Sequence, residues 1–231
     1  DDELVKIRLS GKHDNFYECM QKAKVNVDTR LKEKIQKFLN QLEQEALDSY
    51  VPIIRKEMQQ FLKLLLAMKR PMRILEVGTA VGFSAILMAE YDPVPCEITT
   101  IENYEKRIPI AKENFIRAGK EKQIMLLEGD AAQILPTLTE SYDFIFMDAA
   151  KGQYIHFMPD ILRLLGSEGT LVSDNVLQDG DIIESRFAVT RRNRTIHKRM
   201  RAYLYELTHD ERLVTAVLPI GDGVTVSTWK K

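Results

Sequence analysis

The sequence predicts an α/β protein built on a doubly wound, mostly parallel sheet, and three observations support this fold class. From residue 73 onward, short apolar runs alternate with helical stretches, as in βαβ units whose strands are covered on both faces. Glycine or acidic residues follow the ends of these runs. The last two β-rich segments flank Gly221-Asp222-Gly223, which indicates an antiparallel hairpin.

Two helices are predicted before the first strand. Apolar residues recur at three- and four-residue steps from Leu31 to Ala46, with Asp28 or Thr29 as the cap. A second amphipathic stretch, Arg55–Met68, ends before a proline. We therefore expect a single domain over residues 1–231, with residues 1–70 as a helical cap and residues 71–231 as a Rossmann-like core.

Seven strands are expected in that core. The parallel strands are predicted at Arg73–Val77, Glu97–Ile101, Ile124–Leu127, Tyr142–Met147 and Gly169–Ser173. The strands of the C-terminal hairpin are predicted at Leu213–Pro219 and Val224–Trp229. Because each parallel strand is short and nearly all apolar, helices should cover both faces of the sheet.

Composition and charge exclude several classes of protein. The 231 residues are 45% hydrophobic and carry a net charge of −1, which is unlike a disordered or wholly basic chain. No apolar run approaches the roughly 20 residues that span a bilayer, and the first residues lack the pattern of a secretory signal. Two cysteines, Cys19 and Cys96, are too few for a disulfide framework and predict reduced thiols in a cytoplasmic protein.

A glycine loop follows the first strand and predicts a ligand site. Residues 76–82 have the spacing E-x-G-x-x-x-G, which differs from the G-x-G-x-x-G of dinucleotide-binding folds. Glu102 ends the second strand, where an acid can accept both ribose hydroxyls. Asp130 and Ala131 end the third strand, where they could contact an adenine edge. Together these features favour S-adenosylmethionine over NAD, although the loop alone is equally typical of an ordinary turn.

Oxygen ligands follow the next two strands. Asp148 ends the fourth strand, and Asp174 and Asn175 end the fifth. Since carboxyl ends of parallel strands meet at one edge of a sheet, these side chains should converge. Such a set suits Mg²⁺ or Mn²⁺. The alternative is that each aspartate only caps the next helix.

Lys151 is the candidate general base. It lies three residues beyond Asp148, at the start of the next helix. A neighbouring dication disfavours the ammonium form of a lysine, so its amine could accept a proton. A substrate hydroxyl bound beside the same cation would be acidified. The alternative is a solvated lysine at a helix start.

As a set, these motifs resemble those of the cation-dependent class I O-methyltransferases, which include catechol and caffeoyl-CoA methyltransferases. The resemblance covers about residues 28–231 and implies a homodimer, catalysis by Lys151 and Asp148, and metal ligation by Asp148, Asp174 and Asn175. It also implies contacts to the methyl donor at Ile54, Gly78, Ser84, Glu102, Asp130, Ala131 and Asp148. Within the family, segments 148–154 and 218–224 resemble most the bacterial tRNA 5-hydroxyuridine methyltransferases.

A dense basic stretch bears on the choice of methyl acceptor. Residues 186–201 hold no acid and seven basic side chains, so they leave a charge of −8 on the rest of the chain: Arg186, Arg191, Arg192, Arg194, Lys198, Arg199 and Arg201. We expect a helix from about Arg191, with Ile196, Met200 and Leu204 turned inward. Arginines at this density favour phosphate recognition, although most charge runs are solvated helix faces.

Two acceptors follow from these features. The preferred acceptor is 5-hydroxyuridine in the anticodon loop of tRNA, which would be methylated to 5-methoxyuridine, with the tRNA bound through the basic stretch. The oxygens at C5 and C4 of that base would mimic the adjacent oxygens of a catechol. The alternative acceptor is a small catechol or a caffeoyl-CoA-like ester, in which case the arginines bind coenzyme A phosphates or nothing.

Overall fold

The computed structural model describes residues 16–185 and 189–231. The chain divides into two compact units, residues 1–42 and residues 43–231. Helix α2 spans Phe16–Asp48, so the predicted cap at Asp28 or Thr29 is wrong. Both residues lie inside the helix, because no glycine or proline interrupts the chain between residues 16 and 48. The single domain with a cap over residues 1–70 stays a prediction.

Residues 43–231 contain a seven-stranded mixed sheet with the order β3-β2-β1-β4-β5-β7-β6. Five strands are parallel, while β7 is antiparallel to both β5 and β6. This arrangement confirms the predicted fold class. The strands are β1 (Arg73–Val77), β2 (Glu97–Glu102), β3 (Ile124–Glu128), β4 (Tyr142–Met147), β5 (Leu165–Ser173), β6 (Leu213–Leu218) and β7 (Val224–Trp229).

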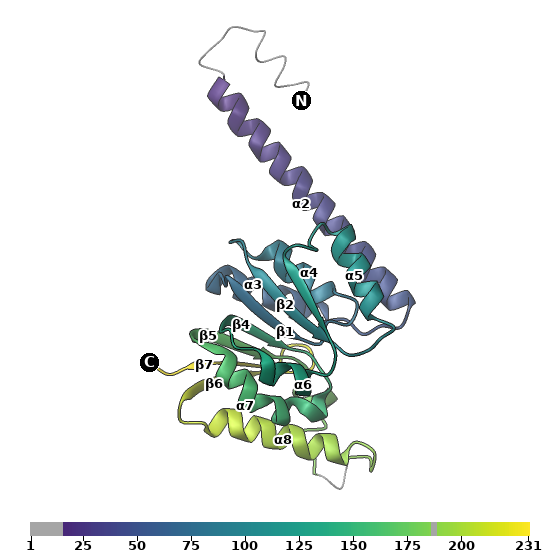
Figure 1. Ribbon diagram of the computed structural model, residues 1–231, viewed down its shortest axis with the longest axis vertical. Helices are drawn as coiled ribbons and strands as arrows, with labels where there is room; N and C mark the ends of the chain where they lie inside the picture. The colour runs from purple at the N-terminus through teal and green to yellow at the C-terminus, as the bar shows by residue number, and fades with distance from the viewer. Residues whose placement is uncertain (1–15, 186–188) are drawn as a thin grey trace. The chain divides into compact units, whose positions relative to one another are not determined.

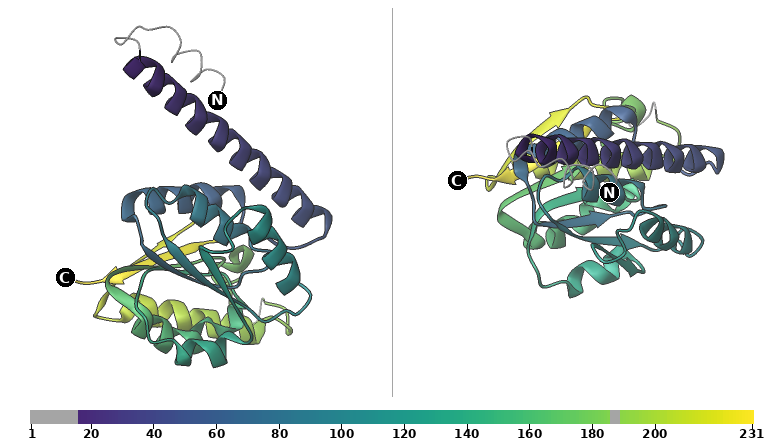
Figure 2. Two further views of the ribbon diagram at one scale, coloured as in Figure 1. Left: turned by 45° about the horizontal axis from the view of Figure 1, so that its top comes forward. Right: turned by 90° about the horizontal axis from the view of Figure 1, so that it is seen from above.

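Helices cover both faces of the sheet (Figures 1 and 2). One face carries α3 (Lys56–Lys69), α4 (Phe83–Tyr91) and α5 (Ile108–Arg117). The other face carries α6 (Ala131–Ile134), α7 (Tyr154–Leu164) and α8 (Arg194–His209). The short 3-10 turns are η2 (Leu135–Thr137), η3 (Lys151–Gln153) and η4 (Gln178–Gly180).

The core lies between the sheet and these two helical layers. Strand β4 is central, and its residues Phe144, Ile145 and Phe146 are fully buried. Tyr154 of α7 and Tyr203 of α8 are fully buried within the layer that covers one face. Strands buried on both faces produce nearly continuous apolar runs, which is why most strand positions were predicted closely. Strand β5 is the exception, since it begins at Leu165 rather than at the predicted Gly169, and its first four residues are mostly not buried.

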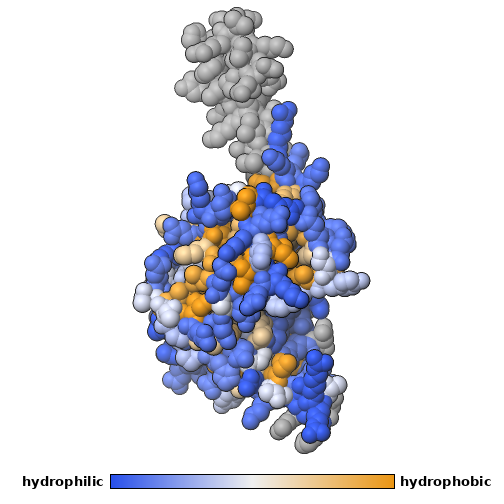
Figure 3. Space-filling view, turned by 45° about the vertical axis from the view of Figure 1, so that its right-hand side comes forward, coloured by the Kyte–Doolittle hydropathy of each residue, from blue (hydrophilic) through white to orange (hydrophobic). Residues whose placement is uncertain are grey.

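On the face drawn in Figure 3, hydrophobic side chains gather among hydrophilic ones. The thiol of Cys96 is free and buried, whereas the side chain of Cys19 lies outside the described residues. Among the helices of the described chain, none is both long and apolar enough to cross a bilayer. The homodimer and the cytoplasmic location stay predictions.

Phe144→Ala should reduce the free energy of unfolding by about 3–5 kcal/mol, because it leaves a cavity in the central strand. The matched control is Met125→Ala on the edge strand β3, where the side chain is 58% exposed. This control should change the free energy by no more than about 0.5 kcal/mol. Urea unfolding followed by circular dichroism measures both, and equal losses would contradict the assignment of the core.

Candidate active site

A cavity of about 670 Å³ opens at the carboxyl ends of β1, β2, β3 and β4. All seven residues expected to contact a methyl donor line it, together with the candidate base: Ile54, Gly78, Ser84, Glu102, Asp130, Ala131, Asp148 and Lys151. Asn175 also lines the cavity. The preceding residue, Asp174, is buried, with 3% of its surface exposed. The sheet therefore brings the predicted donor site and the predicted metal site to one edge.

Gly78 allows the ends of β1 and β4 to approach each other. Its φ is +106°, and a Cβ atom built there would lie 2.2 Å from the carbonyl oxygen of Asp148. The backbone N–H of Asp148 donates to the carbonyl of Val77. Any side chain at position 78 would therefore push the loop away from the strand that carries the aspartate.

Glu76 is fully buried beneath the glycine loop. The Ser84 hydroxyl donates to its Oε1 atom at 2.5 Å, and the Thr100 hydroxyl donates to its Oε2 atom. Burial raises the pKa of the Glu76 carboxyl from 4.5 to about 7, although both hydroxyl bonds act to lower it. Glu76 thus connects β1 to Thr100 of β2 and to Ser84 of α4. Ser84 also lines the cavity.

Glu102 fixes the loop on the other side of the cavity. Its Oε2 atom accepts from the backbone N–H of Ala80 at 2.7 Å. Its Oε1 atom accepts from the N–H groups of Asn103 and Tyr104 at 3.0 and 2.8 Å. The carboxylate is therefore pre-positioned at the cavity wall, with lone pairs left for further donors. Its contact with a ribose stays a prediction.

Asp130 has a structural function of its own. Its Oδ1 atom accepts from the backbone N–H of Ala132 at 2.9 Å, so it caps α6. Asp130 and Ala131 both line the cavity, which is compatible with the predicted adenine contact without testing it.

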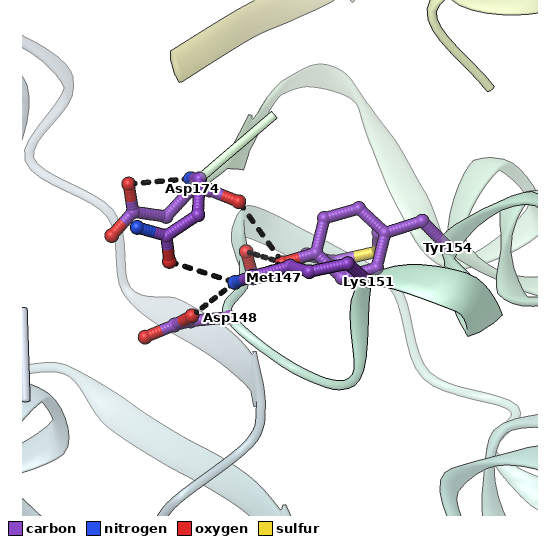
Figure 4. Close-up of polar contacts among 6 residues, drawn as sticks. Met147, Asp148, Lys151, Tyr154 and Asp174 are labelled. Atoms are coloured by element: carbon purple, nitrogen blue, oxygen red, sulfur yellow. Dashed lines mark hydrogen bonds and ion pairs between the residues drawn. The ribbon is translucent and has the colours of Figure 1, made fainter. Parts of the chain in front are cut away.

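Lys151, Asp148 and Asn175 converge at the floor of the cavity (Figure 4). The Lys151 Nζ atom lies 2.8 Å from Asp148 Oδ1 and 2.7 Å from Asn175 Oδ1. The ammonium group therefore sits between two of the predicted ligand oxygens. Neither aspartate of the set caps a helix: Asp174 Oδ1 accepts from the N–H of the next residue at 2.7 Å.

The carboxyl group of Asp174 has a raised pKa. Burial and the nearby Asp148 carboxylate raise the pKa of Asp174 from 3.8 to about 6. Two carboxylates and an amide oxygen, with a lysine cation between two of them, form a donor set that fits a hard divalent cation. Among the described residues, no group of three or more His, Cys, Asp or Glu side chains is placed to hold a metal ion, so the predicted site takes its third side-chain ligand from the amide of Asn175.

The basic stretch lies outside this cavity. Its described members are absent from the cavity lining, and Arg186 lies outside the described residues. Arg191, Arg192 and Lys198 are exposed. Three arginines donate to backbone carbonyls, and Arg201 among them is exposed as well: Arg194 donates to Val189, Arg199 to Gly152 and Arg201 to Ile182.

The helix of the basic stretch differs slightly from expectation. It begins at Arg194 rather than Arg191. Ile196, expected to face inward, is 37% exposed, while His197 is buried and its Nε2 atom contacts the carbonyl of Glu184. Met200 is fully buried, as expected. The buried positions are therefore shifted by one residue at the start of the helix, because a histidine with a backbone partner can occupy the apolar side.

Sequence reasoning missed several residues at this site. Tyr104, Arg107 and Phe157 line the cavity, and the Tyr154 hydroxyl lies 3.3 Å from Lys151 Nζ. Tyr154 had a usable signal, because residues three apart lie on the same side of a helical turn. Tyr104 and Arg107 had only their nearness to Glu102 in sequence.

Comparisons with known proteins bear on this site. A family model described as O-methyltransferase matches residues 28–230. A catechol O-methyltransferase from Niastella koreensis is 36% identical over 129 residues, which cover 54% of this chain and 58% of that protein. Caffeoyl-CoA O-methyltransferase 2 from Populus trichocarpa is 30% identical over 178 residues, which cover 72% and 70% of the two chains.

Two solved structures share the fold. A putative caffeoyl-CoA O-methyltransferase from Staphylococcus aureus superimposes with a TM-score of 0.77 and 29% identity, covering 92% of this chain and 100% of that one. The SAH-bound methyltransferase PaMTH1 from Podospora anserina gives 0.75 and 26%, covering 89% and 96%.

The buried carboxyl of Glu76 should make stability depend on pH. Because its folded pKa is about 7 and its usual value is 4.5, its contribution is complete below pH 4.5 and is lost as the pH rises through 7. The difference in unfolding free energy between the wild type and Glu76→Gln should fall by about 2–3 kcal/mol from pH 5 to pH 8. Urea titrations at both values test this, and a constant difference would contradict it.

Proposed function

The chain belongs to the O-methyltransferase family, and from this premise we propose that it transfers a methyl group from S-adenosylmethionine to an acceptor hydroxyl with the help of a divalent cation. The observation that carries the proposal is the convergence of Lys151 with Asp148 and Asn175 in the cavity that Gly78 and Glu102 also line. The SAH bound to PaMTH1, whose fold is similar, supports a donor of this class.

The residues of the cavity divide the chemistry between them. Glu102 and the glycine loop bind and orient the donor, whose sulfonium carries the reactive methyl group. The Lys151 amine takes the proton of the acceptor hydroxyl, and the resulting oxyanion attacks the methyl carbon. The carbon–sulfur bond breaks, its electron pair stays on sulfur, and S-adenosylhomocysteine leaves while the proton remains on Lys151.

Asp148, Asp174 and Asn175 would hold the cation. When bound, a divalent cation supplies positive charge that favours the ionised form of the acceptor hydroxyl. The raised pKa of Asp174 reflects carboxylates held close together in a buried place. A donor set made only of oxygen atoms suits Mg²⁺ and Mn²⁺.

The acceptor we favour is a small molecule with two adjacent oxygens, such as a catechol or a caffeoyl-CoA-like ester. The catechol and caffeoyl-CoA methyltransferases among the relatives support this class. Two neighbouring oxygens would allow one to be deprotonated by Lys151 while the other helps to orient the ring at the cation site. The cavity lining is mixed, with Phe157 beside the polar residues Gln153 and Asn175, as an aromatic acceptor with polar substituents requires.

A second candidate acceptor is 5-hydroxyuridine in a tRNA anticodon loop. The observation that favours it is the position of α8: Arg199 donates to the carbonyl of Gly152 at 3.2 Å, next to the candidate base. Exposed basic residues just before this helix, Arg191 and Arg192, and Lys198 within it could bind phosphates near the cavity. An extruded base would then enter the site.

Lys151→Met should lower turnover by about 100-fold or more, since general bases contribute 10²–10⁴-fold. Binding of S-adenosylhomocysteine, measured by calorimetry, should stay nearly unchanged. Lys112→Met is the matched control, because Lys112 is exposed and pairs only with Glu128 among the described ion pairs.

Removal of the cation is a separate test. Excess EDTA should abolish wild-type turnover. Full activity in Lys151→Met or in EDTA would contradict the base or the cation, respectively.

The two acceptors can be separated by one assay with labelled donor. Wild-type protein is given a catechol, caffeoyl-CoA, or total tRNA from cells that lack this protein, and the tRNA is analysed for 5-methoxyuridine. We expect transfer to a catechol-type acceptor, and Arg191→Glu/Arg192→Glu should leave it unchanged. Transfer to tRNA alone, lost in this double variant and at high salt, would instead support the second candidate.

A further inference from the structure

Tyr154 is a buried phenol immediately beside the candidate base. It is the first residue of α7 and is fully buried. Its ring meets the ring of Tyr203 edge to face, with centroids 5.4 Å apart. The hydroxyl points toward the ends of β4 and β5, as Figure 4 shows.

Four polar groups surround the phenol oxygen, and one of them is the backbone of Ala149. The phenol oxygen lies 3.0 Å from the carbonyl of Met147, 3.1 Å from the carbonyl of Asp174 and 3.3 Å from Lys151 Nζ. A phenol has one proton to donate, so it donates to one of the two carbonyls and accepts from the lysine ammonium. Burial raises the pKa of Tyr154 well above its usual value, and the hydroxyl therefore keeps its proton.

The three partners of the Lys151 amine differ, because two of them are also predicted to bind the cation. Lys151 is held by three oxygens, and two of them, on Asp148 and Asn175, are the predicted ligands of the cation. Asn175 has a single amide oxygen, which would be shared between the cation and the amine, and a bound cation would repel the lysine ammonium from Asp148 as well. The phenol is the neutral third partner, and two backbone carbonyls fix its position.

We propose that Tyr154 is a positioning residue for the proposed methyl transfer: its hydroxyl holds the Lys151 amine at the ends of β4 and β5 while Asp148 and Asn175 serve the cation. The inference rests on the proposed function only through the action of Lys151 as a base. Without the hydroxyl, the four-carbon side chain of Lys151 loses its fixed neighbour, and the amine is placed less well for proton transfer.

Tyr154→Phe removes the hydroxyl and keeps the ring. We expect kcat to fall by about 10- to 100-fold, the range for losing a hydrogen bond to a charged group, with an unchanged KM for S-adenosylmethionine. The matched control is Tyr203→Phe, since that phenol is equally buried but lies 2.6 Å from the Ser173 hydroxyl. Tyr203→Phe should keep the wild-type kcat. An unchanged kcat in Tyr154→Phe, or equal losses in both variants, would overturn the proposal.

A second measurement needs no acceptor and so separates this inference from the proposed function. Acetic anhydride labels the Lys151 amine of the folded, donor-free protein in the presence of Mg²⁺, and mass spectrometry compares it with Lys112 as an internal reference. Labelling of Lys151 should be several-fold faster in Tyr154→Phe than in the wild type or Tyr203→Phe. Unchanged labelling would refute the positioning role, whereas a wild type inactive on every acceptor would refute only the proposed function.

Discussion

The parallel pairing of β4 with β5 is the constraint on which the site depends. Met147 is in register with Ser173, so the residues that follow, Asp148 and Asp174, leave adjacent strands at the same level. The N–H of Asp174 donates to the carbonyl of Met147, which continues the ladder one step beyond the strands. Each side chain is therefore placed by backbone hydrogen bonds, and little conformational freedom remains to be lost when a ligand binds.

The same constraint explains how far the sequence could predict the molecule. The ranges of β1, β4 and β7 matched because buried strands are short apolar runs between turn residues. The start of α2 did not match, since a helix without a glycine or proline has no boundary in its pattern. The polar residues after each strand were brought together as expected, because the topology requires it.

The convergence of the strand ends was predicted, but the individual atomic contacts between segments far apart in sequence were not. The Lys151 amine meets Asn175 across 24 residues, and Arg199 meets Gly152 across 47. Such distances depend on how α7 and α8 pack over the sheet, which periodicity does not specify. For the same reason, the sequence showed that the basic stretch is dense in charge, but it did not show which of its residues are exposed and which donate to backbone carbonyls.

Helix α8 combines two tasks that are often carried out by separate elements. Its inner side, with Met200 and Tyr203, completes the core over one face of the sheet. Its first turns carry exposed cations and, through Arg199, a hydrogen bond to the turn that holds Lys151. A ligand that pulls on this helix would therefore act on the turn of the candidate base through a direct contact.

The hairpin formed by β6 and β7 supports the loop that follows β5 and its candidate metal ligands. Strand β7 pairs with β5, and the N–H groups of Val176 and Leu177 donate to the carbonyls of Gly223 and Asp222. At Gly223, with φ +82°, a Cβ would collide with Leu177 at 2.2 Å. While the ribosome is still making the chain, the loop after Asn175 lacks these partners. The loop that follows the candidate metal ligands therefore gains its backbone partners only after residues 222 and 223 have been made.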